Sequence, residues 1–489
     1  MSEIFCSDTF RSGSSTCLAF ETMMKCERLV LLLLAFLLYA PLSASPAQAD
    51  RVDDYVREQM RLRHVPGLAL AVVRDGRVIK ESGYGLASVE LEVRVSSSTV
   101  FEIGSISKQI TAAAVMMLVE EGKVSLNDPV STYIAESPGS WRGVTVRHLL
   151  THTSGLKNYN GLPGFELTEH LKRAEFIKRI GAYPSSIAPG EAHSYGNINY
   201  SLLGYVIEQV SGKSYWQFIS ERIFKPLGMT STRDRDPHYI IKNRAQGYEW
   251  EDGQLVGRDY DLTDVFSAGA IVSTVQDLEK WEAGFSSGLL VKPSSIEQIW
   301  TPVRLNSGMT YPYGFGWYIE TLRGHPVRRH GGQTAGFSAS IARYPEDRMT
   351  VIVLCNIGTA GVARHIGQVI AKLSVPALSL RTLEIKRDED PQTTARLRGF
   401  LGGLLTGKPS AVMLTKDAFD SLSSDLERAN WQRIAAYGQL RAFNLTGGEI
   451  EGNRRTLSYR AEVGEHLLLL SFALNREGKV SELSLEEEE

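Results

Sequence analysis

The sequence predicts a mixed α+β protein: an antiparallel sheet flanked by helices, a mostly helical subdomain, and a small α+β domain at the C-terminal end. Residues 67–73 and 77–84 have strand patterns and are joined by Asp75-Gly76, a dipeptide typical of tight hairpins. Strand signals are sparse through the middle of the chain and return near residues 313–319. The last hundred or so residues begin with helical patterns and end with short alternating strands.

Composition is that of an ordinary globular protein. The chain has 489 residues, 43% hydrophobic and 22% charged, which is long enough for two or three domains. The formal net charge is −3 and Lys and Arg do not cluster, so we expect no nucleic-acid partner. A charged run that ends at Pro391 indicates a linker, which divides the chain into a main domain at 50–375, a linker at 376–391 and an accessory domain at 392–489.

Residues 1–49 have the pattern of a signal peptide. Lys25 and Arg28 precede an apolar run at 29–40, and Ala47-Gln48-Ala49 supplies a small-x-small cleavage site. The run is short for a bilayer span, although a retained anchor is the alternative. We therefore expect an exported protein, periplasmic or extracellular, with no stable membrane span after cleavage. Cleavage would leave Cys355 as the remaining cysteine, which we expect to be a small core residue.

The other elements follow from hydrophobic spacing, taken in order. We expect helices at 52–62, 106–118, 200–210, 275–285 and 360–373, with strands at 337–344 and 350–355. In the accessory domain we expect helices at 395–405 and 419–437, and strands near 440–445, 456–463 and 467–474. The terminal run Glu486–Glu489 has the composition of a solvated tail.

The stretch from Phe101 to Lys108 is the candidate for the chemistry. It has the pattern of a short strand that enters a helix, with Ser105 in the first turn of that helix. Ser105 and Lys108 are three residues apart, so they share one helix face, and a helix N-terminus stabilises negative charge. This is a possible Ser-x-x-Lys nucleophile site. The alternative is an ordinary helix with a serine near its start and a surface lysine.

Two further polar groups follow along the chain. A loop that ends at residue 197 presents Tyr195 and Asn197 just before the helix at 200–210. The simpler interpretation is a turn whose asparagine caps that helix. Farther on, His330 precedes the glycine pair Gly331-Gly332 ahead of a predicted strand.

Metal and phosphate chemistry are not supported. His148 and His152 are four residues apart, but the Glu of an H-E-x-x-H zinc motif is missing, so we expect hydrogen-bonded structural histidines. The segment from Ser211 to Ser214 lacks the first glycine of a P-loop and follows a helix rather than a strand. We therefore expect neither a metal nor an organic cofactor.

Taken together, the three polar groups resemble the motifs of the serine β-lactamase and penicillin-binding-protein family. The resemblance covers residues 51–375 and includes Leu-Leu-Thr-His-Thr-Ser-Gly-Leu at 149–156 and Pro-Leu-Gly-Met-Thr at 226–230. It is closest to the class C-like branch with esterases, D-aminopeptidases and D-peptidases. It implies a β-lactamase/transpeptidase-like fold.

The resemblance also implies a role for each residue. Ser105 would be the nucleophile, Lys108 and Tyr195 would share the proton transfers, and Asn197 would orient Lys108 and the substrate. The backbone amides of Ser105 and Gln333 would hold the oxyanion, and Gly331 and Gly332 would let substrate approach the strand. The residue chemistry agrees, because a serine hydroxyl needs a nearby base and a desolvated lysine can supply one.

His330 departs from the family pattern. β-Lactamases and penicillin-binding proteins usually have lysine there, which helps to hold a substrate carboxylate, whereas unperturbed histidine is mostly neutral at pH 7. We therefore predict an exported serine hydrolase acting on an ester or amide, such as a short ester or a D-amino-acid peptide. The alternatives are a β-lactamase or D,D-carboxypeptidase, and a binding or sensor protein without turnover.

Overall fold

The computed structural model describes residues 46–163, 165, 171–185, 187–451 and 454–488. The predicted signal peptide therefore lies almost wholly outside the described residues, and its expected cleavage site falls within helix α2, Pro46–Leu62. The described part of the chain contains no helix with the length and apolar character that a membrane span requires.

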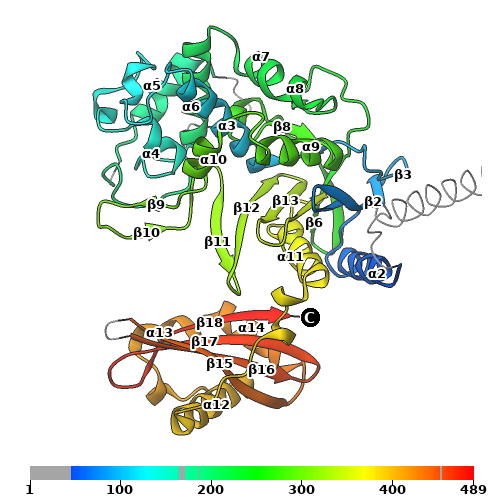
Figure 1. Cartoon of the computed structure of the whole chain (residues 1–489), viewed down its shortest axis with the longest axis vertical. Helices are drawn as coiled ribbons and strands as arrows, with labels where there is room; N and C mark the ends of the chain where they lie inside the picture. The colour runs from blue at the N-terminus through cyan, green and yellow to red at the C-terminus, as the bar shows by residue number, and fades with distance from the viewer. Residues whose placement is uncertain (1–45, 164, 166–170, 186, 452–453, 489) are drawn as a thin grey trace, which may run out of the picture. The chain divides into compact units, whose positions relative to one another are not determined.

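A seven-stranded antiparallel sheet supports the main domain (Figure 1), in the order β11-β12-β13-β14-β1-β2-β3. Its strands are β1 Gly67–Arg74, β2 Arg77–Ser88, β3 Val93–Arg94, β11 Tyr318–Leu322, β12 His325–Thr334, β13 Phe337–Tyr344 and β14 Met349–Cys355. The predicted hairpin is confirmed, because Arg74 pairs with Arg77 across the Asp75-Gly76 turn. The neighbouring strands β14 and β1 are far apart in the sequence of the domain, and Leu70 pairs with Val353.

Both faces of this sheet are covered at its centre, so strands β1 and β14 are buried along most of their length instead of alternating. Along β1, Leu68 and Leu70 pack into a cluster with α2 and with α11, Val362–Ser374. Ala69 and Ala71 face the other way, into the cluster formed with the helical subdomain. Cys355 is free and fully buried in the first cluster, as the sequence predicted.

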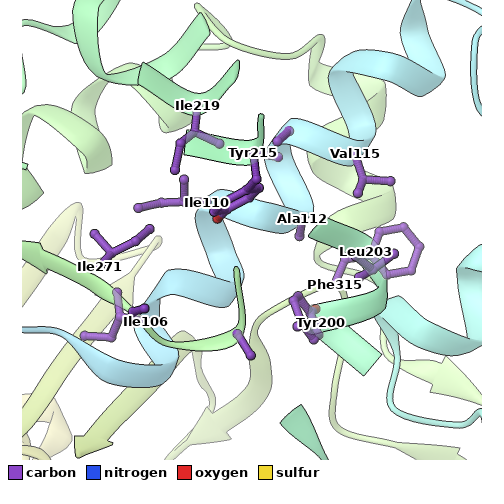
Figure 2. Close-up of a cluster of buried hydrophobic side chains, with 14 of the residues drawn as sticks. Ile106, Ile110, Ala112, Val115, Tyr200, Leu203, Tyr215, Ile219, Ile271 and Phe315 are labelled. Atoms are coloured by element: carbon purple, nitrogen blue, oxygen red, sulfur yellow. The ribbon is translucent and has the colours of Figure 1, made fainter. Parts of the chain in front are cut away.

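The helical subdomain is organised around α3, Ser107–Glu120. Its other helices are α4 Val146–Leu150, α5 Arg173–Gly181, α6 Asn197–Ser211, α7 Tyr215–Ile219, α8 Lys225–Leu227, α9 Val275–Ser286 and α10 Pro293–Ile299. Every residue of α3 from 107 to 118 is buried, so the helix is enclosed on all sides. Figure 2 shows Ile110, Ala112 and Val115 among side chains that include Tyr200 and Leu203 of α6.

Several short strands of the main domain differ from the prediction. The strand expected at 313–319 begins only at Tyr318, because Gly316 has a φ of +77° and lies against α3. A Cβ atom on Gly316 would lie 2.8 Å from the carbonyl oxygen of Lys108, so glycine is required there. A hairpin of β6 Gly247–Glu251 and β7 Gln254–Arg258 was not predicted, nor was the small sheet β4-β8-β5.

The C-terminal residues form a four-stranded antiparallel sheet with three helices and their own hydrophobic cluster. Its elements are α12 Pro391–Leu405, α13 Lys416–Leu422, α14 Asp425–Ala435, β15 Leu440–Glu451, β16 Arg454–Val463, β17 His466–Leu474 and β18 Val480–Glu488. The helix expected at 419–437 is interrupted, because the Ser424 side chain accepts a hydrogen bond from the Glu427 amide and caps α14.

The expectation of a solvated tail was wrong for residues 486–488, which form the end of β18. They pair with residues 467–469 of β17. Glu488 is only 6% exposed and accepts a hydrogen bond from the Leu380 amide at 2.5 Å. The acidic residues 486–488 therefore form a strand, because the apolar strand β17 pairs with them.

Candidate active site

Ser105 lies in a 3-10 turn, Gly104–Ile106, between strand β4, Phe101–Glu102, and helix α3. The turn immediately precedes the α-helix, close to the position that the sequence predicted. Strand β4 pairs with β8, Ile271–Ser273, which fixes the approach to the turn. Gly104 has a φ of +50°, and a Cβ atom there would lie 2.7 Å from the Gln333 nitrogen. Glycine therefore lets the Ser105 turn meet strand β12 backbone to backbone.

Lys108 is fully buried and contacts three oxygen atoms. Its Nζ lies 2.9 Å from the Oγ of Ser105, 2.8 Å from the Oδ1 of Asn197 and 2.8 Å from the carbonyl oxygen of Ala268. It also lies 4.9 Å from the centre of the Tyr195 ring. Burial lowers the pKa of Lys108 well below its ordinary value.

These contacts determine which hydrogen bonds a neutral Lys108 would donate and accept. The Ala268 carbonyl oxygen and the Asn197 side-chain oxygen can only accept hydrogen bonds. An uncharged amine has two N–H groups, which these two acceptors would use. The remaining lone pair of Nζ then faces Ser105, whose hydroxyl can donate its proton along that contact.

Asn197 is the first residue of α6 and does not cap it. Gly196 occupies the capping position, without a side-chain bond to the helix. The Asn197 side chain binds Lys108 through Oδ1, and its Nδ2 donates to Asn160 at 3.1 Å. The Asn197 amide donates to the Asn158 side chain at 2.9 Å. These partners orient the side chain amide with its oxygen toward Lys108.

Tyr195 lies at the open side of the same group and is 37% exposed. Loss of hydration raises the pKa of Tyr195 well above its ordinary value, and the neighbouring Ser105 side chain opposes that rise only in part, so the phenol keeps its proton at neutral pH. Tyr195 can therefore transfer a proton between Ser105 and a leaving group only if it receives one in return.

Strand β12 brings Gln333 opposite Ser105. A Cβ atom on Gly332 would lie 1.9 Å from the carbonyl oxygen of Ile103, so this glycine serves the contact between β12 and the Ser105 turn. Gly331 has no such contact, because its nearest neighbour would be the Ala339 oxygen at 3.6 Å. The idea that both glycines open space for substrate is thus corrected for Gly332, whose space is filled by protein.

His330 is 2% exposed and both of its ring nitrogens are engaged. Its Nδ1 donates to the Gly331 carbonyl at 2.6 Å, and its Nε2 accepts from the Tyr313 hydroxyl at 3.1 Å. Burial lowers the pKa of His330 to about 3, so the ring is neutral. The imidazole therefore offers no charge and no free nitrogen to a substrate carboxylate.

Two cavities share Ser105 and Gln333 in their lining. One, of about 350 Å³, is also lined by Tyr195, Arg329 and Arg364 and by no carboxylate among the described residues. Arg329 is paired with Glu320, whereas Arg364 is exposed and has no ion-pair partner in the described part of the chain. The other cavity, of about 540 Å³, contains Asn197 together with Glu249 and Asp261.

A buried ion pair lies directly behind this site. Glu102 is 3% exposed and accepts hydrogen bonds from Arg235 at 3.1 Å and from Thr334 at 2.6 Å. Thr334 follows Gln333 in β12, so Glu102 ties this strand to the one that leads into Ser105. Burial raises the pKa of Glu102 to about 7, although Thr334, Arg235 and Arg244 oppose that rise.

The histidines set aside as structural are hydrogen-bonded within the fold. His148 accepts at Nδ1 from the Thr145 amide at 3.2 Å and completes a capping box at the start of α4. His152 is fully buried and accepts at Nδ1 from the Gly196 amide at 3.3 Å. No group of three or more His, Cys, Asp or Glu residues in the described ranges could hold a metal ion.

The sequence did not reveal every member of the site. The Ala268 carbonyl, Asn160 and Arg364 lie outside the three polar groups that the sequence suggested, and Glu102 lies within the stretch from Phe101 to Lys108 but was given no role. A carbonyl has no sequence signature, and a lone arginine or asparagine is common on protein surfaces. Their relevance depends on contacts between segments far apart in the chain.

The family model described as Beta-lactamase matches residues 52–373. The chain is 28% identical over 327 residues to protein flp of Staphylococcus aureus strain MW2, covering 64% of each protein. It is 30% identical over 311 residues to penicillin-binding protein 4* of Bacillus subtilis strain 168, covering 59% of this chain and 68% of that protein.

A solved structure resembles most of the chain in fold. The octameric penicillin-binding protein homologue from Pyrococcus abyssi aligns with a TM-score of 0.60 and 24% identity, over 90% of this chain and 95% of that one. This likeness concerns the fold alone. It supports the α+β architecture predicted from the sequence.

Proposed function

We propose that this chain, which belongs to the beta-lactamase family, is a serine hydrolase that cleaves a short ester or a D-amino-acid amide or peptide through an acyl-enzyme on Ser105. The observation that carries this proposal is the environment of Lys108. Its Nζ is 2.9 Å from the Ser105 oxygen, fully buried, and has two other contacts that are acceptors. A neutral lysine held in this way is a base directed at the nucleophile.

The first half of the reaction follows from these contacts. The Ser105 oxygen attacks the substrate carbonyl carbon while its proton passes to Lys108 Nζ. The backbone amides of Ser105 and Gln333 stabilise the resulting oxyanion, and each such donor is typically worth about 100- to 1000-fold in rate. When the intermediate collapses, the proton passes from Lys108 through the Tyr195 hydroxyl to the departing alcohol or amine.

The second half repeats these transfers with water. A water molecule attacks the acyl-enzyme carbonyl and loses a proton toward Tyr195 and Lys108. The ester bond to Ser105 breaks, the proton returns to the Ser105 oxygen, and a carboxylic acid leaves. Because Tyr195 keeps its proton in the resting site, it acts as a relay in both halves and Lys108 is the base.

The second cavity supports a substrate with a free amino group, as in a D-aminoacyl amide. Glu249 and Asp261 line it together with Asn197, and their negative charge suits such a group, although Glu249 is also paired with Arg258 at 3.2 Å. His330 gives no support to a substrate carboxylate, because the ring is neutral and both nitrogens are occupied.

A specific observation favours a second candidate. Arg364 lines the 350 Å³ cavity beside Ser105 without an ion-pair partner in the described ranges, and could bind the carboxylate that His330 cannot. Substrates with such a carboxylate include β-lactams and the C-terminus of D,D-peptides. Hydrolysis of nitrocefin, or release of the terminal D-alanine from a D-alanyl-D-alanine peptide, would favour this candidate over an ester or aminopeptide substrate.

Labelling tests the acyl-enzyme independently of the substrate. The protein is treated with a fluorophosphonate and with benzylpenicillin, and its intact mass is measured before peptide mapping. We expect a single fluorophosphonate adduct on Ser105 and hydrolysis of short p-nitrophenyl esters, with neither in Ser105→Ala, whereas a benzylpenicillin adduct would favour the second candidate. No adduct and no hydrolysis by a folded protein would favour a binding or sensor protein without turnover.

We also propose that the protein is exported. The proposal rests on the charged, apolar and small-residue pattern of residues 25–49. Expression of the full chain in a bacterium, followed by fractionation and N-terminal sequencing, tests it. We expect a mature form that begins near Asp50 outside the cytoplasm. An uncleaved chain in the cytoplasm would contradict it.

A further inference from the structure

His152 accepts hydrogen bonds from the residue before Tyr195 and from the residue after it. Its carbonyl oxygen accepts a hydrogen bond from the Ser194 amide at 2.8 Å, and its Nδ1 accepts from the Gly196 amide at 3.3 Å. These are the two residues that flank Tyr195. We propose that His152 is a positioning residue that holds the Tyr195 hydroxyl on Ser105. The inference rests on the proposed function, in which Tyr195 relays protons.

The ring of His152 also supports the Tyr195 ring directly. Their centres are 4.3 Å apart and the planes are inclined by 40°. The rings of Tyr200 and Tyr313 each lie 5.1 Å from the His152 ring, so it is enclosed by aromatic groups. Tyr195 is 37% exposed, and the His152 ring is the nearest of the aromatic rings that contact its covered side.

The orientation of the imidazole is itself determined. The Gly196 amide can only donate, so Nδ1 must be an acceptor, and the Asn199 side chain amide lies 3.1 Å from the same atom. Burial lowers the pKa of His152 well below its ordinary value, which keeps the ring neutral. A neutral ring adds no charge next to Lys108, whose role as a base requires that it too is uncharged.

Stability alone does not explain a histidine at this position. The residue has a φ of +55°, a backbone region that residues other than glycine adopt uncommonly, with Asn, Asp and His the most frequent among them. Its Nε2 is buried without a hydrogen-bond partner among the described residues. Both features are destabilising, and such costs concentrate at functional sites.

Three variants test the inference. In His152→Ala the acceptor and the ring are lost, and we expect kcat to fall by about 10- to 100-fold with a smaller change in KM, because displacement of a catalytic group by about 1 Å can cost 100-fold. In His152→Asn the Oδ1 atom can replace Nδ1, and asparagine tolerates the positive φ, so most of the activity should return. His152→Phe keeps a ring without the acceptor and should resemble the alanine variant.

A double variant separates positioning from a general structural role. In a Tyr195→Phe background, His152→Ala should lower kcat by less than about twofold, since the group that it positions is already absent. The measurements are kcat and KM for a p-nitrophenyl ester and the rate of fluorophosphonate labelling, with circular dichroism to confirm folding. If His152→Ala does not fold, the phenylalanine variant carries the comparison.

Two results would overturn the inference. One is a folded alanine or phenylalanine variant with the kcat of the wild type. The other is a loss that is equally large with and without the Tyr195 hydroxyl. If Tyr195→Phe alone retained full activity, the proposed relay would fail as well, so the two failures are distinguishable.

Discussion

Replacement of Lys108 by methionine tests whether the lysine is neutral in the folded protein, without any knowledge of the substrate. Methionine has a similar length, fills the same space and cannot bind a proton. In the fold, burial lowers the pKa of Lys108 well below its ordinary value, whereas in the unfolded chain it is about 10.4. We expect the effect of the substitution on the free energy of unfolding to depend on pH.

The sign and size follow from proton counting. Between the folded and the unfolded pKa, the unfolded wild type binds one proton that the folded protein does not. Its free energy of unfolding therefore rises with pH, by about 1.4 kcal/mol per pH unit, until the pH reaches the unfolded pKa. The methionine variant lacks this contribution. From pH 7 to pH 9 the wild type should thus gain free energy of unfolding relative to Lys108→Met, up to a maximum of about 2.7 kcal/mol, which is reached when the folded lysine is neutral over the whole range.

Urea unfolding at pH 7, 8 and 9 measures this difference. Six of the seven tryptophans lie between residues 141 and 317, so their fluorescence reports mainly the unfolding of the main domain. The exposed Lys242 supplies a matched control, because Lys242→Met makes the same substitution at the surface, away from Ser105. A constant difference for Lys108→Met would mean that Lys108 carries its proton in the fold, and the proposed base would be lost.

Three other substitutions test separate parts of the site. Tyr195→Phe should lower kcat by about 100-fold or more with little change in KM, and an effect on KM alone would contradict the relay. The pKa of Glu102 is about 7 in the fold and about 4.3 in the unfolded chain. As the pH rises from 4.5 to 7, the free energy of unfolding of the wild type, measured with urea, should therefore fall by about 3 kcal/mol relative to Glu102→Gln. A difference independent of pH would show that Glu102 ionises normally. Arg364→Glu should raise KM about tenfold or more for a D-alanyl-D-alanine peptide with a free carboxylate and leave its C-terminal amide unchanged, and equal effects on both would remove the anion-binding role.

The sequence was informative where spacing along the chain implies contact in space. Ser105 and Lys108 are one helical turn apart, and the Asp75-Gly76 hairpin is local, so both could be predicted. The approach of Gln333 to the Ser105 turn and the contact between Gly316 and Lys108 depend on residues more than 200 positions apart. Likewise, the acidic residues Glu486–Glu488 predict solvent exposure, because their pairing with residues 467–469 of β17 has no signature in the run itself.

The pairing of β1 with β14 also bears on how the protein folds. Leu70 and Val353 are adjacent in the sheet but nearly three hundred residues apart in sequence, and β12, which carries Gln333, is joined to β1 only through β13 and β14. The sheet therefore cannot close until almost the whole main domain has left the ribosome. Contacts of such long range make folding slow. In the exported protein that we propose, a slowly folding chain would stay able to pass through a translocation channel, and the oxyanion site would form after export.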